Sequence, residues 1–279
     1  MFGPASSETK SRSGARRLAL ITGASSGIGA AFARAYAERG LDVVLVARRI
    51  ERLEALAAEL AAAHGIEAHA IPADLARFEA HVPVLEAVAA RGRTVDVLVN
   101  NAGFGIPKSF TGVVWERQRD FLMTLVVSAC GFAYGVIPGM VERGSGAIIN
   151  VASIAGFSPG VAGNTLYPGA KSLAIKFSQA LDAEYRARGL RISALCPGAT
   201  ESEFLQTAGL AELTARAPRM AAQSASAVVE IAIAANERGR VVIIPGWRNR
   251  LAVGLMRALP EAVTRPIING VAAKYRPRE

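Results

Sequence analysis

Short apolar runs alternate along the chain with longer stretches in which apolar residues recur at helical spacing. The run 41–47, LDVVLVA, is almost continuously apolar, which is typical of a strand buried on both faces. The pattern predicts strands at 18–22, 41–47, 67–71, 95–99, 146–152, 191–196 and 240–244. It predicts helices at 30–39, 50–63, 78–90, 115–141, 164–186 and 225–235. Because strands and helices alternate, we expect an α/β fold: a doubly wound parallel sheet of about seven strands with helices on both faces.

The same pattern divides the chain into three parts. Residues 1–16 are polar and lack the apolar run of a signal peptide, so we expect a flexible leader there. Residues 17–246 hold all the predicted strands and no linker, which predicts one domain. Residues 247–279 follow the last strand and are expected to form a C-terminal helical extension.

Composition narrows the class of protein. Hydrophobic residues make up 51% and charged residues 20% of the chain, which is enough apolar material for a large core. The two cysteines, Cys130 and Cys196, stand in apolar runs, which suits a reducing compartment. No uninterrupted apolar stretch reaches the roughly 18 residues of a spanning helix, and we expect a cytoplasmic protein. His64, His69 and His81 show no ligand spacing, so no metal is expected.

A glycine-rich turn follows the first predicted strand. The sequence TGASSGIG at 22–29 leads directly into a helix. In this context Gly23 allows a sharp turn, Gly27 allows close approach of a pyrophosphate, and Gly29 allows tight packing of helix on strand. Free N–H groups and the helix dipole favour phosphate at the helix start. The candidate cofactor contacts in this turn are Gly23, Ser25, Ser26, Gly27, Ile28 and Gly29.

The end of the second strand indicates which dinucleotide binds. An acidic residue there would bind a ribose 2′-hydroxyl, but the strand ends in Ala47, Arg48 and Arg49, and Asp42 stands at its opposite end. A guanidinium suits a 2′-phosphate. We therefore expect NADP(H) in preference to NAD(H), with Arg48 as the main contact and Ser25 as a second donor. The alternative is that both arginines only begin a solvated helix.

Further motifs follow in a fixed order. They are Asp74-Leu75 after the third strand, Asn101-Ala102-Gly103 after the fourth, Ser153 after the fifth, Tyr167 and Lys171 in a YxxxK pattern, and Pro197-Gly198 with Thr200 after the sixth. From 18 to 246 the chain thereby resembles the short-chain dehydrogenase/reductase family. The resemblance implies a Rossmann-type dinucleotide-binding and catalytic domain. It implies cofactor contacts at all of these motifs except Ser153, and catalysis by Ser153, Tyr167 and Lys171. It also implies a homodimer or homotetramer.

The implied chemistry interconverts a carbonyl and an alcohol. Tyr167 and Lys171 are four positions apart, so they share one helix face, and the ammonium is expected to lower the phenol's pKa. Tyr167 would then exchange a proton with the substrate oxygen, which Ser153 holds by a hydrogen bond. The family implies that Lys171 also binds the nicotinamide ribose. A tyrosine and a lysine one turn apart are by themselves usually only helix-surface neighbours, and a lone serine here could be a strand-end cap, but the glycine turn and Ser153 favour the catalytic interpretation.

The chain departs from the family pattern in two places. The family's catalytic asparagine corresponds to Leu125, which cannot position a water, and the loop between Ser153 and Tyr167 is one residue longer than usual. Two functions therefore stay open: an active NADPH-linked oxidoreductase, or an NADP(H)-binding sensor with little turnover. The loop residues Phe104, Phe157 and Phe204 favour a small, apolar carbonyl or alcohol as the substrate.

The extension 247–279 is basic and amphipathic. Leu251, Leu255 and Leu259 recur at helical spacing as far as Pro260. From 238 to the end nine basic residues stand against two acidic ones, a net charge of +7 within a chain of +9. Either a helical pair packs over the substrate side or a subunit interface, or a basic amphipathic element makes peripheral contact with anionic membranes. No aromatic-basic motif accompanies the charge, so nucleic acid is not an expected partner.

Overall fold

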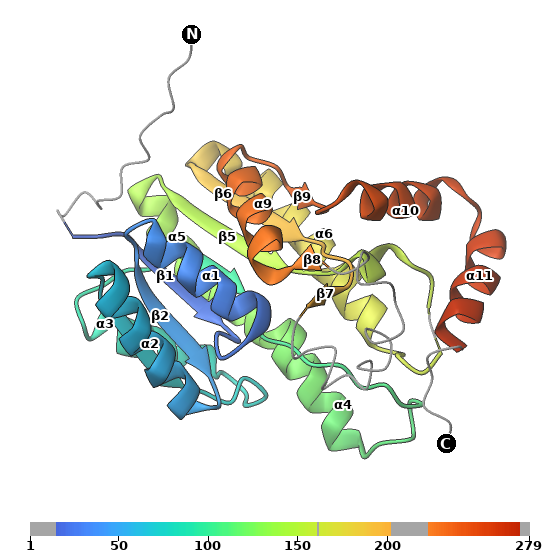
Figure 1. Cartoon of the computed structure of the whole chain (residues 1–279), viewed down its shortest axis with the longest axis horizontal. Coiled ribbons are helices and arrows are strands. Elements are labelled where there is room, and N and C mark those ends of the chain that lie inside the picture. Colours follow the sequence, from blue (N-terminus) through green and yellow to red (C-terminus); the bar gives the residue numbers. More distant parts are fainter. Residues whose placement is uncertain (1–14, 161, 202–222, 274–279) are drawn as a thin grey trace, which may run out of the picture.

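The computed structural model describes residues 15–160, 162–201 and 223–273, and a seven-stranded parallel sheet forms its centre (Figure 1). In chain order the strands are β1 (Leu18–Thr22), β2 (Asp42–Ala47), β3 (Ala68–Pro72), β4 (Val97–Asn100), β5 (Gly146–Val151), β6 (Leu190–Leu195) and β9 (Val242–Ile243). Their spatial order is β3-β2-β1-β4-β5-β6-β9, so the strand order reverses between β1 and β4. The predicted doubly wound α/β fold is confirmed.

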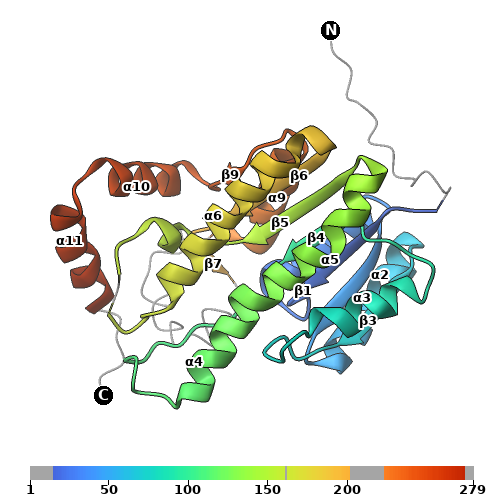
Figure 2. The same ribbon diagram turned by 180° about the vertical axis from the view of Figure 1, so that it is seen from behind.

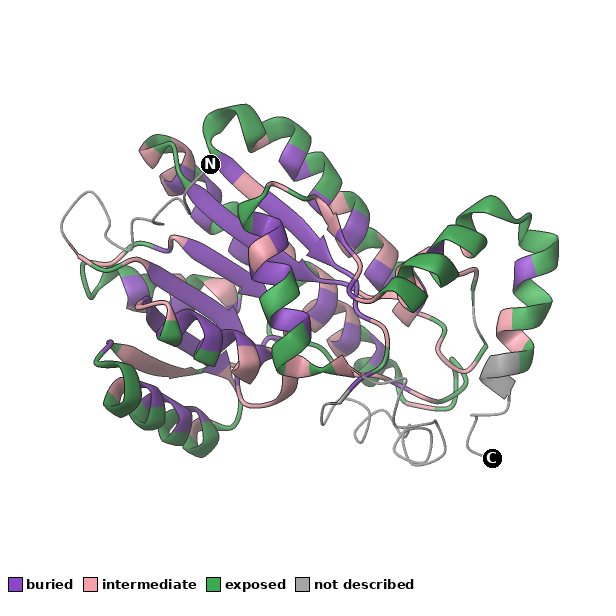
Figure 3. Ribbon diagram, turned by 45° about the horizontal axis from the view of Figure 1, so that its top comes forward, coloured by how far each residue is buried: buried purple, intermediate pink, exposed green. Residues whose placement is uncertain are grey.

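Helices cover both faces of this sheet (Figures 1 and 2). One face carries α1 (Gly27–Glu38), α2 (Ile50–His64) and α9 (Ala225–Glu237), and the other carries α3 (His81–Ala89), α5 (Ser128–Arg143) and α6 (Tyr167–Tyr185). Successive strand residues enter the two cores in turn, as Leu20 and Ile21 do, and both are fully buried. Figure 3 shows the central strands buried along their length, which explains why their sequences read as continuous apolar runs.

One long helical stretch, Trp115–Arg143, is apolar enough by length and composition to cross a membrane. It consists of α4 (Trp115–Leu122), a π-helical turn η1 (Met123–Val127) and α5. Polar residues interrupt its apolar run, which is why the sequence shows no uninterrupted apolar stretch of spanning length. Phe132 and Met140 on α5 are fully buried against the sheet, while 39% of the most apolar window of the whole stretch is buried.

Local backbone accounts for the places where prediction and structure differ. The helix predicted at 78–90 begins at His81, because Glu79 has a φ of 57°, a left-handed conformation that helices exclude. The strands β7 (Thr200–Glu201) and β8 (Gln223–Ser224) pair with each other but are too short to show a period in the sequence. Two 3₁₀ turns were not predicted, η2 (Ile154–Phe157) and η3 (Arg186–Arg188).

The extension after the sheet is helical, as predicted. It forms α10 (Trp247–Ala258) and α11 (Glu261–Ala273), with Pro260 between them, and both lie beyond the β9 edge (Figure 1). α10 packs on η2, and the Ala162 amide donates to Asn269 Oδ1 at 3.4 Å in α11. Phe204, residues 274–279 and most of the predicted leader lie outside the described residues.

Candidate functional site

The glycine turn lies at the point where the strand order reverses. Gly23 has a φ of 67°, and its amide donates to Val46 O at 2.7 Å. Asn101 Nδ2 donates to Thr22 O at 2.9 Å and to Gly23 O at 3.2 Å. A Cβ at Gly23 would lie 2.8 Å from Ala102 Cα, so no larger residue fits. The loops after β1 and β4 therefore hold each other in place.

The start of α1 fits a bound phosphate. Gly27 has a φ of 56°, and a Cβ on Gly29 would overlap the carbonyl oxygen of Gly23. Ser26 precedes the helix in extended conformation, and among the described residues its side chain makes no capping hydrogen bond. The first-turn N–H groups and the helix dipole thus remain available to an anion. This cradle fits the pyrophosphate of a dinucleotide.

Arg49, which follows the predicted main contact Arg48, contacts the glycine turn. Its Nη2 donates to Ser25 Oγ at 2.9 Å and to Ser26 Oγ at 3.2 Å. Arg48 is exposed at the end of β2. Asp42 lies at the other end of that strand, where it accepts a hydrogen bond from Arg93 at 2.8 Å. Two guanidinium groups and no carboxylate thus follow β2 at the edge where the turn lies.

The remaining predicted cofactor motifs lie at the carboxyl ends of their strands. Asp74 is exposed and accepts from the Ala76 amide at 3.2 Å, while Leu75 is buried. Ala102 N donates to Thr22 Oγ1 at 3.1 Å, and Gly103 lies against Leu125.

The loop after β6 joins the same edge. Pro197 O accepts from the Ile154 amide at 3.0 Å, which ties this loop to η2. Thr200 Oγ1 donates to Gly198 O at 3.2 Å. The structure therefore brings every predicted cofactor motif to one edge of the sheet.

Ser153 has two contacts, one structural and one in the site. It follows β5 in extended conformation, and its Oγ accepts from the Ala155 amide at 3.2 Å, which caps η2. It also hydrogen-bonds the Tyr167 hydroxyl. The longer loop between the two residues does not separate them.

Tyr167 and Lys171 occupy the first two turns of α6 and lie together. Lys171 is buried, its Nζ donates to Val151 O at 2.7 Å, and Nζ is 5.6 Å from the centre of the Tyr167 ring. Burial raises the pKa of Tyr167 to about 12. The hydrogen bond with Ser153 lowers this pKa, but its effect is the smaller of the two. Burial also lowers the pKa of Lys171 to about 8. The expectation that Lys171 lowers the pKa of Tyr167 is wrong for this structure, because desolvation of the phenolate is the larger effect.

Leu125 lies in the π-helical turn beside these residues. It is buried in an apolar cluster with Tyr167 and Ala170, and a Cβ on Gly103 would be 3.3 Å from its Cγ. Phe121 lies in the same cluster, with ring centres 6.5 Å from Tyr167 and 5.6 Å from Phe104. An apolar surface therefore borders the phenol, and Leu125 is part of it.

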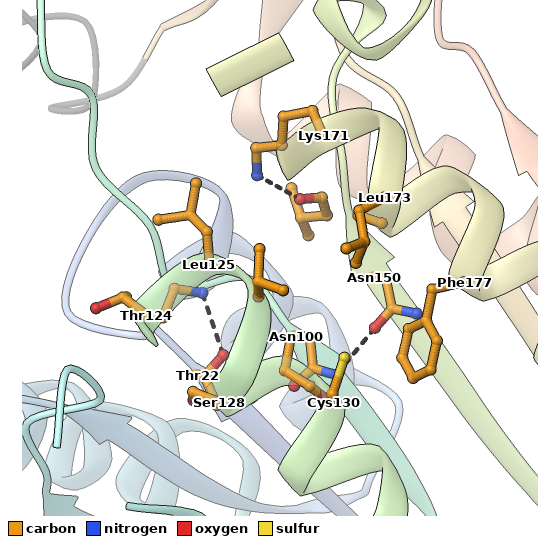
Figure 4. A pocket seen from close by; sticks show the side chains of 15 residues that line it. Thr22, Asn100, Thr124, Leu125, Ser128, Cys130, Asn150, Lys171, Leu173 and Phe177 are labelled. Carbon is orange, nitrogen blue, oxygen red and sulfur yellow. Dashed lines mark hydrogen bonds between the residues drawn. The ribbon is translucent and has the colours of Figure 1, made fainter. Parts of the chain in front are cut away.

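A small cavity lies behind Leu125 and Lys171 (Figure 4). Its volume of about 20 Å³ suits one water molecule. Asn100 Nδ2 donates to Asn150 Oδ1 at 2.9 Å, and Asn150 Nδ2 donates to Ser178 Oγ at 2.9 Å. Asn100 Oδ1 is buried and has no partner among the described residues, so the wall offers a free acceptor.

Sequence reasoning missed these asparagines, although a signal exists. Asn100 and Asn150 are register partners at the ends of two neighbouring strands that are otherwise apolar. A buried polar group in such a strand needs a hydrogen-bond partner, so paired asparagines predict a network. Within the described ranges, no three His, Cys, Asp or Glu side chains gather as metal ligands do.

Comparison with known proteins agrees with this geometry. The family model described as short chain dehydrogenase matches residues 17–213. The very-long-chain 3-oxoacyl-CoA reductase of Anas platyrhynchos is 35% identical over 183 residues, which are 64% of this chain and 58% of that protein. The inactive hydroxysteroid dehydrogenase-like protein 1 of Homo sapiens is 33% identical over 184 residues, 65% of this chain and 55% of that protein.

A solved structure extends the match over more of the chain. The short-chain dehydrogenase from Sphingobium yanoikuyae in complex with NADPH is 32% identical, with a TM-score of 0.76, and the match covers 88% of this chain and 97% of that one. The sequence match, the strand order and the ordered motifs agree. The chain therefore belongs to the short-chain dehydrogenase/reductase family of oxidoreductases.

Proposed function

We propose that this protein is an NADP(H)-dependent oxidoreductase that interconverts a ketone or aldehyde with an alcohol, with Tyr167 as general acid or base. One observation carries the proposal. The Tyr167 hydroxyl is hydrogen-bonded to Ser153, and Lys171 lies under the same ring, at the sheet edge that also holds the glycine turn.

The cofactor preference follows from the residues around the turn. Gly23 and Gly29 shape a cradle that a Cβ would fill, and Arg49 lies on that cradle with Arg48 beside it. The NADPH in the Sphingobium structure supports the 2′-phosphorylated form, and NAD(H) is the less favoured alternative. When bound, the nicotinamide ring supplies or accepts the hydride.

Tyr167 is suited to give a proton. With a pKa of about 12 it is protonated at neutral pH, so it can donate to a carbonyl oxygen without prior activation. Ser153, hydrogen-bonded to that hydroxyl, is placed to donate to the same oxygen and to hold the carbonyl in position. The resting, protonated phenol is the form that carbonyl reduction needs, and the phenolate left after donation must regain a proton, for which Lys171 is the neighbouring donor.

Lys171 is suited to handle protons behind the tyrosine. A pKa of about 8 lets the ammonium both hold and release a proton near neutral pH. Its Nζ faces the Val151 carbonyl, which fixes its position under the ring of Tyr167.

The substrate is proposed to be apolar. Phe104, Ile106 and Phe121 belong to the cluster that contains Tyr167, and the Arg117 guanidinium stacks 4.0 Å from the centre of the Phe104 ring. By its name, the Anas platyrhynchos relative reduces a 3-oxo group on a very long acyl chain, which supports this class of substrate.

The test is NADPH oxidation with a panel of ketones and aldehydes of increasing apolar size. We expect turnover with some of them, and Tyr167→Phe should lower it by about 10²–10⁴-fold while NADPH still binds. Tyr185→Phe is the matched control, because Tyr185 is the last residue of α6, at the opposite end of this helix from Tyr167. Equal turnover of wild type and Tyr167→Phe would rule out the proposed role.

A second candidate function is an NADP(H) sensor with little turnover. Leu125 supports it, because this buried side chain offers no hydrogen bond where the family has an asparagine, and a relative called inactive shares the family. Tight NADPH binding without turnover on the whole panel would favour the sensor.

We also propose that the protein is a cytoplasmic homodimer or homotetramer. Trp115, Val127 and Tyr134 are exposed along α4, η1 and α5, which supports a subunit contact there. The free thiols Cys130 and Cys196 support a reducing compartment. Sedimentation velocity tests the assembly, and a monomer at micromolar concentration would contradict it.

A further inference from the structure

An exposed apolar stripe runs along α10 and α11. Trp247, Leu251 and Leu255 share one side of α10, Leu259 follows in the turn, and Val263 and Ile267 share one side of α11, and all six are exposed. Trp247 is 63% exposed and Ile267 59%, whereas Val253 and Thr264 on the other side of these helices are buried. The inner side thus packs on the protein, and the outer side presents large apolar groups to solvent.

Arginines accompany this stripe. Arg248, Arg250, Arg257 and Arg265 are exposed on the same helices, and Arg248 stacks 5.3 Å from the centre of the Trp247 ring. Among the described residues of α10 and α11, Glu261 is the only acid, and it pairs with Arg265 at 2.7 Å. The surface is therefore both apolar and strongly positive.

These two properties together select the partner. A two-fold contact with a second copy would bring the same arginines face to face, which is unfavourable. A nucleic acid would use the arginines but leave six large apolar side chains in water. In an anionic bilayer the apolar side chains can insert at the acyl boundary, the tryptophan can lie at the interface, and the arginines can pair with the headgroups. We propose that α10 and α11 form a docking element for anionic membrane surfaces.

The docking element is fastened to the loops of the candidate site. Asn249 Nδ2 donates to Pro245 O at 2.8 Å, and a Cβ on Gly198 would collide with the Asn249 side chain. α10 also packs on η2, which Ser153 caps. When the protein is docked through α10 and α11, the edge of the sheet that carries the candidate site therefore lies next to the bilayer, as the position of both helices in Figures 1 and 2 indicates. A carbonyl substrate dissolved in the membrane could then reach the site, and this consequence rests on the proposed function. Docking itself does not depend on the proposed function.

The test is co-sedimentation of the full-length protein with vesicles of phosphatidylglycerol and phosphatidylcholine, compared with pure phosphatidylcholine. We expect binding to the anionic vesicles alone, weakened at high salt. Leu251→Ser with Leu255→Ser should reduce partitioning more than tenfold. Arg250→Gln with Arg257→Gln should reduce it about fivefold for each charge removed. The matched control is Arg77→Gln with Phe78→Ser, two exposed neighbours before α3 that should leave binding unchanged.

The opposite results overturn the proposal. They are wild-type protein that stays in solution with anionic vesicles, equal binding to neutral vesicles, or leucine and arginine variants that bind like wild type. If the wild-type protein were a dimer and only the leucine variant were monomeric, the surface would be assigned to contact with a second copy. Binding of duplex DNA that only the arginine variant loses would assign it to nucleic acid. Thermal melting and NADPH titration establish that the variants are folded, and carbonyl reduction is measured separately, so a failure of the proposed activity is distinguishable.

Discussion

Lys171 Nζ donates to the main-chain oxygen of Val151 at 2.7 Å and lies 5.6 Å from the centre of the Tyr167 ring. The ammonium is thus held between a strand end and the phenol, in a place from which water is largely excluded. Removal from water lowers the pKa of Lys171 to about 8 and raises that of Tyr167 to about 12. The two groups therefore carry their protons over different ranges of pH.

This difference predicts the pH dependence of carbonyl reduction. Above about pH 8 the free enzyme loses the Lys171 proton, while Tyr167 stays protonated. We expect kcat/KM with NADPH to be level below pH 8 and to fall about tenfold per pH unit above it, because kcat/KM reports groups of the free enzyme. Initial rates between pH 6 and 10 measure this.

Lys171→Arg provides the control for the assignment. An arginine stays charged throughout this range, so the variant should be slower but should show no decline near pH 8. A decline at the same pH in Lys171→Arg would assign it to another group.

The sequence predicted the sheet because its strands are buried on both faces and therefore read as unbroken apolar runs. It also predicted Ser153, Tyr167 and Lys171 as candidate catalytic residues, through the ordered motifs that resemble the family, and the structure brings the three together. The pKa of Tyr167 was predicted in the wrong direction, because the extent of burial depends on how α6 packs beside β5 and not on the spacing of two residues. The network of Asn100 and Asn150 depends on strand register, which the sequence leaves open.

The two arginines after β2 differ in a way that only the structure shows. Both side chains are exposed, but Arg49 donates hydrogen bonds to Ser25 and Ser26 in the turn that any dinucleotide pyrophosphate would use, whereas Arg48 lies beside it at the end of β2. Arg48→Ala should weaken NADPH binding by at least tenfold and leave NADH unchanged, because a charged hydrogen bond to phosphate is worth about 1.5–3 kcal/mol. Arg49→Ala should weaken both.

Fluorescence titration of each variant with each cofactor measures this difference. If Arg48→Ala weakened NADPH and NADH equally, its assignment to the 2′-phosphate would be wrong. An unchanged NADH affinity in Arg49→Ala would show that the serines do not need the guanidinium.

Substitution of Leu125 tests which of the two proposed functions applies. Its side chain lines the cavity beside Lys171, where Asn100 Oδ1 is a free acceptor among the described residues. Leu125→Asn places a second polar group on that wall and should raise kcat by favouring a water next to Lys171. The free energy of unfolding should fall by about 1–3 kcal/mol, because Leu125 also packs in an apolar cluster.

Leu125→Met is the matched control, since it keeps the volume and adds no hydrogen bond. It should leave both kcat and stability nearly unchanged. A folded Leu125→Asn variant with the kcat of wild type would show that the leucine does not limit proton supply.

The same substitution, glycine to alanine, is expected to have opposite effects on stability at two helical positions, because the added methyl group has free space at one and overlaps the backbone at the other. In α10 a Cβ on Gly254 has nothing within 4 Å, so Gly254→Ala should raise helix stability by about 0.5–1 kcal/mol. In α1 a Cβ on Gly29 would overlap the Gly23 carbonyl, so Gly29→Ala must displace the turn. We expect it to cost about 1–3 kcal/mol of overpacking and to weaken NADPH binding at least tenfold, as thermal melting and titration would measure. Normal NADPH affinity in Gly29→Ala would mean that the cofactor does not lie on this turn, and the assignment of the whole sheet edge would fall with it.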